Sequence, residues 1–378
     1  MSNQPRHLII DIRSLLPKNP ATGIPEYTKQ LVSHIVENFG KNLRERNAKI
    51  TLFSSGKERP DLSFLYPFRA YFSDFHLPYP NRLLNASLKF FSYPALDSFF
   101  GGKRGQTIFF APNLNLFPVS RGVKIVTTFH DLSYERYPEL LSPKERFWHS
   151  FIKPRAIASQ ADAIIAVSES TKQDLVDIYG IAPAKIHTIY SGVGEEFKPN
   201  PLTEKGPVIL YLGSVEGRKN IATLIHAFSI LKRMSSHKNT TLIIAGPGFL
   251  SKKVRPHRDI SFLGTVSNEK RLQLYQEASL FVYPSFFEGF GFPPLEAMSC
   301  GVPVITSFCA SLPEATGKAA LAVNPHKAHE FAGAMDALLT DRKLSDYYIK
   351  RGLEQVKKFS WQKTAKETLD VLLNLNHK

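Results

Sequence analysis

The chain of 378 residues has little cysteine and no long apolar run. Its two cysteines, Cys300 and Cys309, are too few for a disulfide framework or a cysteine-based metal cluster, and they suit a reducing compartment. Because no stretch approaches 18 consecutive apolar residues, we expect no transmembrane helix. The first residues lead directly into an apolar strand, so we also expect no signal peptide.

Sequence motifs of two large protein classes are missing as well. No zinc finger, RRM signature or basic zipper occurs, so a nucleic-acid partner is the weakest explanation for the net charge of +15, and we expect none. No Gly-x-Gly-x-x-Gly follows a predicted strand, which argues against a dinucleotide-binding dehydrogenase. An anionic membrane surface or a lipid-phosphate acceptor fits the positive charge better.

Short apolar runs alternate with helical patterns along the whole chain, which is typical of parallel α/β folds. Expected strands lie at 8–12, 50–53, 107–110, 123–129, 163–167 and 186–190, and then at 208–212, 242–245, 280–283 and 304–305. The polar stretch 198–207 between these groups has the composition of a linker. The length fits two domains, which we place at 1–198 and 205–357, with a C-terminal helix at 358–378.

Two glutamates eight positions apart, Glu288 and Glu296, bracket a glycine- and proline-rich run. Gly289 and Gly291 permit a tight turn, and Pro294 fits the first turn of a helix that we expect from Leu295 onward. Glu288 is therefore expected on a loop and Glu296 in the first helical turn. Since a helix N-terminus between two carboxylates can bind phosphate, the run suits a sugar nucleotide.

A second candidate for phosphate binding follows the first predicted strand of the second half. The turn that begins at Gly213 carries Arg218 and Lys219, and a helix is expected from near Asn220. Ligands bind at the carboxyl ends of strands in open α/β sheets, where two cations can hold a diphosphate. At about 4 Å, and with an effective dielectric near 20, each contact has a Coulomb term of about 4 kcal/mol before desolvation.

The run from Glu288 to Glu296 resembles the glutamate–seven–glutamate motif of retaining glycosyltransferases of family 4, the "glycosyl transferases group 1" type. The segment 131–139 is similar to the mannosyltransferase branch of that family. The resemblance implies a GT-B fold, in which two Rossmann-like α/β domains face each other across a cleft and the last helix crosses back to the first domain. It also implies that the second domain binds the nucleotide sugar and the first binds the acceptor.

The resemblance implies a role for each matching residue. Glu288 would hold the donor sugar and Glu296 the ribose, while Arg218 and Lys219 would neutralise the leaving diphosphate. His130, at the end of a predicted strand, would contact the donor sugar across the cleft. The expected donor-binding set is Gly23, Gly213, Arg218, Lys219, Glu288, Gly289, Phe290, Gly291, Phe292 and Glu296, and the expected catalytic set is His130, Arg218, Lys219 and Glu288.

The sequence therefore predicts a retaining hexosyltransferase that acts in cell-surface polysaccharide synthesis. The donor would be GDP-mannose, with a UDP-sugar close behind, and the acceptor a glycan or a lipid-linked glycan. No cofactor is expected beyond this co-substrate. No Asp-x-Asp metal clamp occurs, so we expect a metal-independent reaction in which cationic side chains and a helix N-terminus stabilise the leaving group. Two alternatives stay open, a sugar-nucleotide epimerase that needs no acceptor and a non-catalytic sugar-nucleotide-binding protein.

The segment 64–100 differs from the rest of the chain in composition. It holds twelve aromatic residues together with Arg69, Arg82 and Lys89. It is either a core-packing insertion or a surface that contacts anionic membrane. We expect a cytoplasmic protein, and on the second interpretation it is peripheral at the inner face of the membrane.

Overall fold

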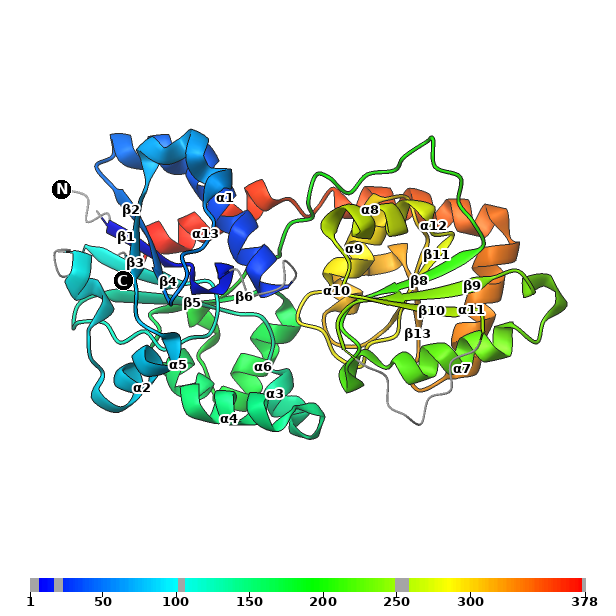
Figure 1. Cartoon of the computed structure of the whole chain (residues 1–378), viewed down its shortest axis with the longest axis horizontal. Helices are drawn as coiled ribbons and strands as arrows, with labels where there is room; N and C mark the ends of the chain where they lie inside the picture. The colour runs from blue at the N-terminus through cyan, green and yellow to red at the C-terminus, as the bar shows by residue number, and fades with distance from the viewer. Residues whose placement is uncertain (1–6, 17–22, 101–105, 249–257, 376–378) are drawn as a thin grey trace. The chain divides into compact units, whose positions relative to one another are not determined.

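The computed structural model describes residues 7–16, 23–100, 106–248 and 258–375. The chain divides into two compact units (Figure 1). Unit 1 comprises residues 1–192 and 361–378, and unit 2 comprises residues 193–360. The first unit therefore ends at Gly192, before the linker-like stretch that we placed from 198 onward, and the returning segment begins at Trp361.

Unit 1 is built on a seven-stranded, wholly parallel sheet in the order β3-β2-β1-β4-β5-β6-β7. Its strands are β1 (His7–Asp11), β2 (Lys49–Ser55), β3 (Ser73–Leu77), β4 (Thr107–Ala111), β5 (Lys124–Phe129), β6 (Ala163–Ala166) and β7 (Ile186–Thr188). Every residue of β1, β4 and β6 is buried, as expected for parallel strands that are covered on both faces. Continuous apolar runs in the sequence therefore mark the strands at the centre of the sheet.

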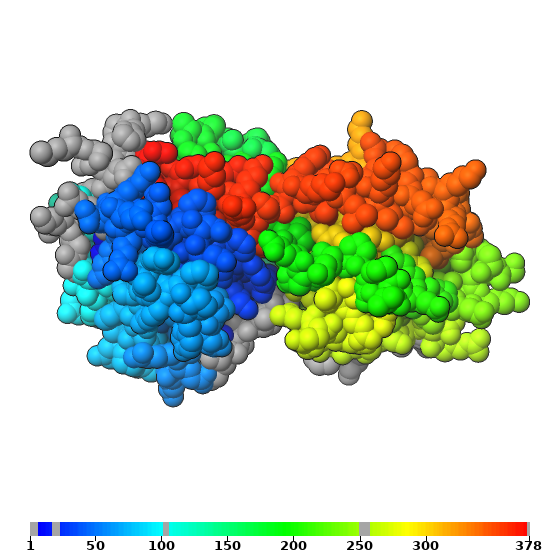
Figure 2. Space-filling view, turned by 90° about the horizontal axis from the view of Figure 1, so that it is seen from above, coloured from blue at the N-terminus to red at the C-terminus, as the bar shows by residue number. Residues whose placement is uncertain are grey.

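The helices of unit 1 include the last helix of the chain. They are α1 (Ile24–Glu45), α2 (Asn81–Phe91), α3 (Ser133–Arg136), α4 (Pro143–Ile152), α5 (Pro154–Gln160), α6 (Glu169–Tyr179) and α13 (Trp361–Leu373). In both views the red α13 lies beside the blue α1 (Figures 1 and 2). The rings of Tyr27 and Trp361 meet at 5.7 Å, and Thr364 donates a hydrogen bond to the Tyr190 carbonyl. The return of the last helix to the first domain is confirmed.

Unit 2 has a six-stranded parallel sheet in the order β10-β9-β8-β11-β12-β13. Its strands are β8 (Val208–Leu212), β9 (Thr241–Ala245), β10 (Ile260–Gly264), β11 (Leu280–Tyr283), β12 (Val304–Ser307) and β13 (Leu321–Val323). Its helices are α7 (Ile221–Leu231), α8 (Asn268–Glu277), α9 (Phe292–Ser299), α10 (Leu312–Thr316), α11 (Ala328–Thr340) and α12 (Arg342–Val356). The predicted α/β class with two Rossmann-like domains is confirmed.

Short 3-10 helices join several of these elements. They are η1 (Arg13–Leu15), η2 (Ser63–Tyr71), η3 (Leu96–Phe100), η4 (Pro138–Leu140), η5 (Pro183–Lys185), η6 (Gly217–Lys219), η7 (Ser235–His237) and η8 (Gly317–Ala319). Two of them follow the strand at which a sheet reverses its order: η1 comes shortly after β1, and η6 comes shortly after β8. Ligands bind open α/β sheets at such positions.

Candidate active site

Arg218 and Lys219 lie on η6, between the carboxyl end of β8 and the start of α7. The backbone of this turn is tied to the glutamate-containing run, because the Phe286 amide donates to the Arg218 carbonyl at 2.8 Å. Asn220 has a φ of 56° and ends the turn, and its side-chain amide donates to the carbonyls of Pro284 and Pro325. The local fold therefore aims the two cations at the loop that carries Glu288.

Glu288 is buried, with 7% of its surface exposed, and Lys219 pairs with it directly. Lys219 Nζ lies 2.6 Å and 2.8 Å from the two carboxylate oxygens and 2.9 Å from the hydroxyl of Tyr283. These contacts equal the three donors of an ammonium group. Arg218 Nη1 lies 3.6 Å from the same carboxylate, at a side chain that is 24% exposed. Arg218 Nε also lies 3.2 Å from Glu216, so two cations and two carboxylates form a compact cluster whose formal charges balance.

The electrostatics of Glu288 follow from this cluster. Burial disfavours the charged carboxylate, but Lys219 and Arg218 outweigh that effect and hold its pKa below its ordinary value. Burial also raises the pKa of Tyr283 well above its ordinary range, with Glu288 adding to the shift, so this hydroxyl stays neutral. The carboxylate is therefore ionised and able to accept hydrogen bonds from hydroxyl groups at neutral pH.

Helix α9 begins at Phe292, earlier than the sequence suggested, and Gly291 caps it with a φ of 106°. A Cβ atom at Gly291 would lie 2.9 Å from a methyl group of Leu312, so glycine is needed there for both conformation and space. Pro293 and Pro294 occupy the first turn and lack N–H groups, which leaves fewer backbone donors for an anion than an ordinary helix N-terminus offers.

The prediction that Glu296 lies in the first helical turn is wrong. Because α9 already begins at Phe292, Glu296 lies in its second turn and is buried, with 4% exposed. It forms an ion pair with Arg271, and the hydroxyl of Tyr275 donates to it at 2.8 Å. Both partners lie on α8, four residues apart, so they share one face of that helix. Glu288 and Glu296 therefore have separate sets of partners.

The aromatic residues of the run pack inside unit 2. Phe290 is 4% exposed, and its ring meets those of Phe292 and Phe359 at 5.4 Å and 5.6 Å. The hydroxyl of Ser311 donates to the carbonyls of Glu288 and Phe290 at 2.9 Å and 3.0 Å. Phe290 and Ser311 thus fix the path of the loop from its inner side, next to Gly289.

His130 follows β5 directly, as predicted, and lies in unit 1. Its Nε2 is 2.9 Å from the Pro112 carbonyl, which can only accept, so Nε2 carries the proton and Nδ1 holds the lone pair of the neutral ring. Burial lowers the pKa of His130, against the opposing effects of that hydrogen bond and of Asp131. The imidazole is therefore neutral near pH 7 and can accept a hydrogen bond from a hydroxyl through Nδ1.

Two glycines of the predicted donor set lie in different units. Gly23 precedes α1 with a φ of 65°, and Thr22 beside it lies outside the described residues. Gly213 follows β8, and its amide donates to the Ala245 carbonyl at 2.9 Å. No single unit therefore contains the whole predicted set: Gly23 and His130 belong to unit 1, and the rest belong to unit 2.

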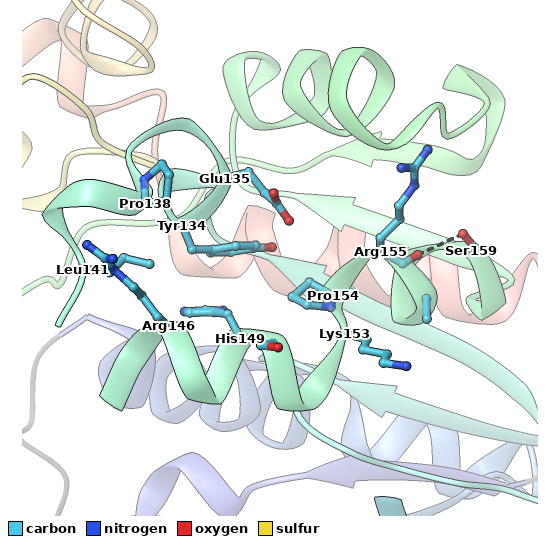
Figure 3. Close-up of a pocket in the computed structure, with 12 residues that line it drawn as sticks. Tyr134, Glu135, Pro138, Leu141, Arg146, His149, Lys153, Pro154, Arg155 and Ser159 are labelled. Carbon is cyan, nitrogen blue, oxygen red and sulfur yellow. Dashed lines mark hydrogen bonds between the residues drawn. The ribbon is translucent and has the colours of Figure 1, made fainter. Parts of the chain in front are cut away.

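A hollow of about 700 Å³ lies on unit 1 among α3, α4 and α5 (Figure 3). The rings of Tyr134 and His149 stack inside it with centroids 4.0 Å apart. The basic side chains on its walls do not converge: Arg146 lies at one end, and Arg155 lies at the other and points elsewhere (Figure 3). Because these basic side chains do not converge, the hollow is not suited to bind the donor diphosphate, although it is large enough.

The comparisons with known proteins cover nearly the whole chain. A family model of glycosyltransferase family 4 matches residues 32–197, and one of glycosyl transferases group 1 matches residues 193–355. The O-antigen chain mannosyltransferase B of Escherichia coli is 33% identical over 282 residues, which cover 70% of this chain and 73% of that protein. The chain belongs to this family of glycosyltransferases.

Other members of the family differ from this glycosyltransferase in length. The serotype-specific mannosyltransferase WbdA of Escherichia coli is 27% identical over 415 residues, which cover 95% of this chain but 47% of the relative. The chain thus spans about half the length of that protein.

Solved structures share the fold. Sucrose-phosphate synthase from Thermosynechococcus elongatus has a TM-score of 0.70 at 20% identity and covers 97% of this chain and 98% of its own. WaaG, a glycosyltransferase involved in lipopolysaccharide biosynthesis, has a TM-score of 0.68 at 15% identity and covers 97% and 99%. The GT-B assignment of the glycosyltransferase rests on this likeness together with the two parallel sheets.

Several side chains that shape the site were missed in the sequence. Tyr283 was treated only as a strand residue, and Ser311, Arg271 and Tyr275 were not considered. The i, i+4 spacing of Arg271 and Tyr275 on a helix was a usable signal for a shared partner. Nothing local marked Glu296 as that partner, because it lies 21 positions after Tyr275 and 25 after Arg271, and only the fold brings them together.

Proposed function

We propose that this glycosyltransferase moves a hexose, mannose in the first instance, from a nucleotide-diphosphate sugar to a glycan or lipid-linked acceptor in cell-surface polysaccharide synthesis. The single observation that carries the proposal is the buried cluster of Glu288, Lys219 and Arg218 at the end of β8 and β11. Relatives named as mannosyltransferases support mannose, and a solved relative of the same fold in complex with UDP and glucose supports a nucleotide donor. Unit 2 binds the donor and unit 1 the acceptor.

In the proposed complex the cations of η6 face the diphosphate. Arg218, which is partly exposed, is placed to receive a phosphate oxygen, while Lys219 already uses three donors on Glu288 and Tyr283. A phosphate would therefore replace one of these acceptors of Lys219. Glu288 accepts hydrogen bonds from the sugar hydroxyls, Glu296 takes the ribose, and His130 accepts from a sugar hydroxyl through Nδ1.

The proposed reaction retains the anomeric configuration. The bond between the anomeric carbon and the diphosphate oxygen breaks, and the acceptor oxygen attacks from the same face. The acceptor proton passes to the leaving phosphate oxygen, so the products are the elongated acceptor and the nucleoside diphosphate. Arg218 and Lys219 stabilise the charge that develops on the diphosphate, which is the largest contribution expected from the protein.

Membrane contact is the third part of the proposal. Among the described residues, no helix combines the length and the apolarity needed to cross a bilayer. The segment 64–100 divides into buried residues such as Leu84 and Leu88 and exposed ones such as Phe90 and Phe91, which are 72% and 78% exposed. Phe151 of α4 links Phe90 to Phe147, itself 69% exposed. We name Phe90, Phe91 and Phe147 the aromatic patch, and propose that it rests on anionic membrane.

A nucleotide screen tests the core of the proposal. GDP-mannose, UDP-glucose and the free nucleotides are titrated against the protein in a thermal-shift assay, because a ligand that binds only the folded state raises the free energy of unfolding by about 2.7 kcal/mol at a hundredfold excess over Kd. A stabilising nucleotide sugar is expected, and its turnover should need an acceptor. Turnover of a UDP-sugar to its epimer without acceptor would replace the proposal with the epimerase alternative.

A further inference from the structure

A pocket of about 410 Å³ lies on unit 1, at the carboxyl ends of two adjacent strands. Arg13 follows β1, and Asn113 and Asn115 follow β4, which pairs with β1. Asn81 and Asn85 reach the pocket from α2, and Trp148 from α4. The pocket thus occupies the edge of the sheet where ligands bind in open α/β folds.

The pocket is electrically balanced. Its single cation among the described lining residues is Arg13, whose guanidinium donates to both oxygens of Asp11 at 2.6–3.0 Å and to the Leu116 carbonyl at 2.8 Å. Both members of this pair are buried, with side chains 3% and 5% exposed. The same described lining contains no acidic residue. A phosphate or carboxylate would therefore find no uncompensated positive charge here, which favours a neutral ligand.

The asparagine side chains supply polar groups of both kinds. Asn113 and Asn115 each accept from the next backbone amide, at 2.7 Å and 3.0 Å, which engages their oxygens and leaves their NH2 groups to act as donors. Asn81 likewise accepts from Ser55 at 2.8 Å. Asn85 Oδ1 is buried and has no hydrogen-bond partner in the described structure, a costly state that a ligand hydroxyl would relieve.

Trp148 adds an aromatic surface to these amides. Its indole is held by packing on the core cluster of unit 1 and by a stacked contact with Phe151 at 6.2 Å. A hexose offers hydroxyls around its ring and an apolar face of C–H groups, so it needs donors, acceptors and an aromatic wall together. Asn81, Asn85, Asn113, Asn115 and Trp148 supply all three.

We infer that this pocket binds a neutral hexose unit of the acceptor glycan, with Asn85 and Trp148 as recognition residues. The inference rests on the proposed function and adds which part of the acceptor is recognised. On this inference unit 1 recognises an uncharged sugar of the acceptor and not a phosphate group.

The test is isothermal titration of the whole chain with two probes, neutral mannotriose and anionic mannose 6-phosphate. Mannotriose should bind, and mannose 6-phosphate should bind at least tenfold more weakly. Asn85→Ala should weaken mannotriose binding about tenfold, and Trp148→Phe should keep affinity within about threefold of wild type, whereas Trp148→Ala should lose it. Asn42→Ala, an exposed asparagine on α1, is the matched control and should change nothing.

A second readout separates this inference from the proposed function. Nucleotide-sugar affinity, measured in the same samples, should stay within twofold in Asn85→Ala, and in turnover assays KM for the acceptor should rise while KM for the donor stays fixed. Wild-type binding of nucleotide sugar without binding of mannotriose, or equal mannotriose affinity in Asn85→Ala, overturns the inference alone. Failure of the wild type to bind any nucleotide sugar removes the proposed function instead.

Discussion

The candidate sites of the two units differ in the side chains that they offer to a ligand. Unit 2 presents a buried cluster of charges, in which two cations flank Glu288 and a third pairs with Glu296. Unit 1 presents a pocket of amides beside an indole, in which the only described cation is already neutralised by Asp11. Both sites lie at the carboxyl ends of parallel strands, so the fold supplies the position and the side chains supply the selectivity.

The difference teaches what each half of a transfer reaction needs. A diphosphate gains charge as it leaves, so the donor site needs fixed cations that are stronger partners in the transition state than in the ground state. A glycan acceptor stays neutral until it attacks, so hydrogen bonds and an aromatic face are enough to hold it. Fixed charges on the acceptor side would favour phosphorylated competitors instead.

The largest effect is expected from Arg218→Ala in unit 2. Its guanidinium is partly exposed, so its loss should leave the fold intact while kcat/KM falls about 100- to 1000-fold, as for removal of one preorganised stabilising group. Steady-state kinetics with the best donor measure this loss, and circular dichroism checks the fold. Unchanged kcat/KM would remove Arg218 from the mechanism.

Lys219→Met should damage stability as well as activity. It leaves the buried Glu288 carboxylate without its closest cation, at a cost of about 3–5 kcal/mol in the free energy of unfolding. Urea denaturation measures this cost. In the double variant Lys219→Met/Glu288→Gln stability should largely return while activity stays lost; equal stability of single and double variants would argue against the ion pair.

The two units should respond to acid at different pH. In unit 1, burial and Lys49 lower the pKa of His7 from 6.5 to about 4, so the unfolded state binds more protons and stability falls as pH drops from about 6.5 to 4. That shift corresponds to roughly 3 kcal/mol. In unit 2, the lowered pKa of Glu288 preserves its contribution above about 4.5 and loses it only in stronger acid.

Urea unfolding between pH 7 and 3, monitored by hydrogen exchange in each unit, checks whether unit 1 loses stability at a higher pH than unit 2. The variant His7→Asn should reduce the loss between pH 6.5 and 4 in unit 1 and leave unit 2 unchanged; the loss should not vanish, because burial also lowers the pKa of His130 and His149 in unit 1. Simultaneous loss in both units near pH 6 would contradict the assignment.

A smaller effect is expected at the aromatic patch of unit 1. Phe90→Ser with Phe91→Ser should lower partitioning onto vesicles that contain phosphatidylglycerol by roughly tenfold or more, since each ring loses apolar burial. Flotation at low and high salt measures this partitioning. The affinity of unit 2 for nucleotide sugar should not change in the variant. Wild-type protein that stays at the bottom of the gradient in both salts would show that the patch does not contact membrane.

The smallest effect, none at all, is expected from chelation. If the cations of η6 replace a divalent metal, transfer should proceed at the same rate in EDTA. Complete loss that Mn²⁺ or Mg²⁺ restores would show that the cationic cluster is not sufficient for the departing diphosphate.

The α/β fold and the charged site of unit 2 could be predicted from the sequence, because both leave local signals in it. Continuous apolar runs marked ten of the strands in the described residues but missed β3, β10 and β13, which are short or interrupted by polar residues and glycine. Glu288, Arg218 and Lys219 lie in short motifs with recognisable spacing. The start of α9 was misplaced: Pro294 was expected in the first turn of a helix running from Leu295, whereas the helix begins at Phe292 and its first turn contains both Pro293 and Pro294.

The uncharged pocket of unit 1 could not be predicted from the sequence. Asn85, Asn113 and Trp148 come from three different elements, and each asparagine by itself is typical of any turn or helix surface. Only the order of β1 and β4 in the sheet brings them to one pocket. Arg271 and Tyr275 escaped notice for the same reason, since their partner Glu296 lies on another helix.

One measurement tests the central claim most directly. The protein is incubated with GDP-mannose or a UDP-hexose and mannotriose, and proton NMR follows the new anomeric signal while nucleoside diphosphate release is quantified. The account predicts one α-linked hexose transferred per nucleotide released, with at least a hundredfold slower transfer in Arg218→Ala. A β-linked product, or nucleotide release at equal rates in wild type and Arg218→Ala, would contradict it.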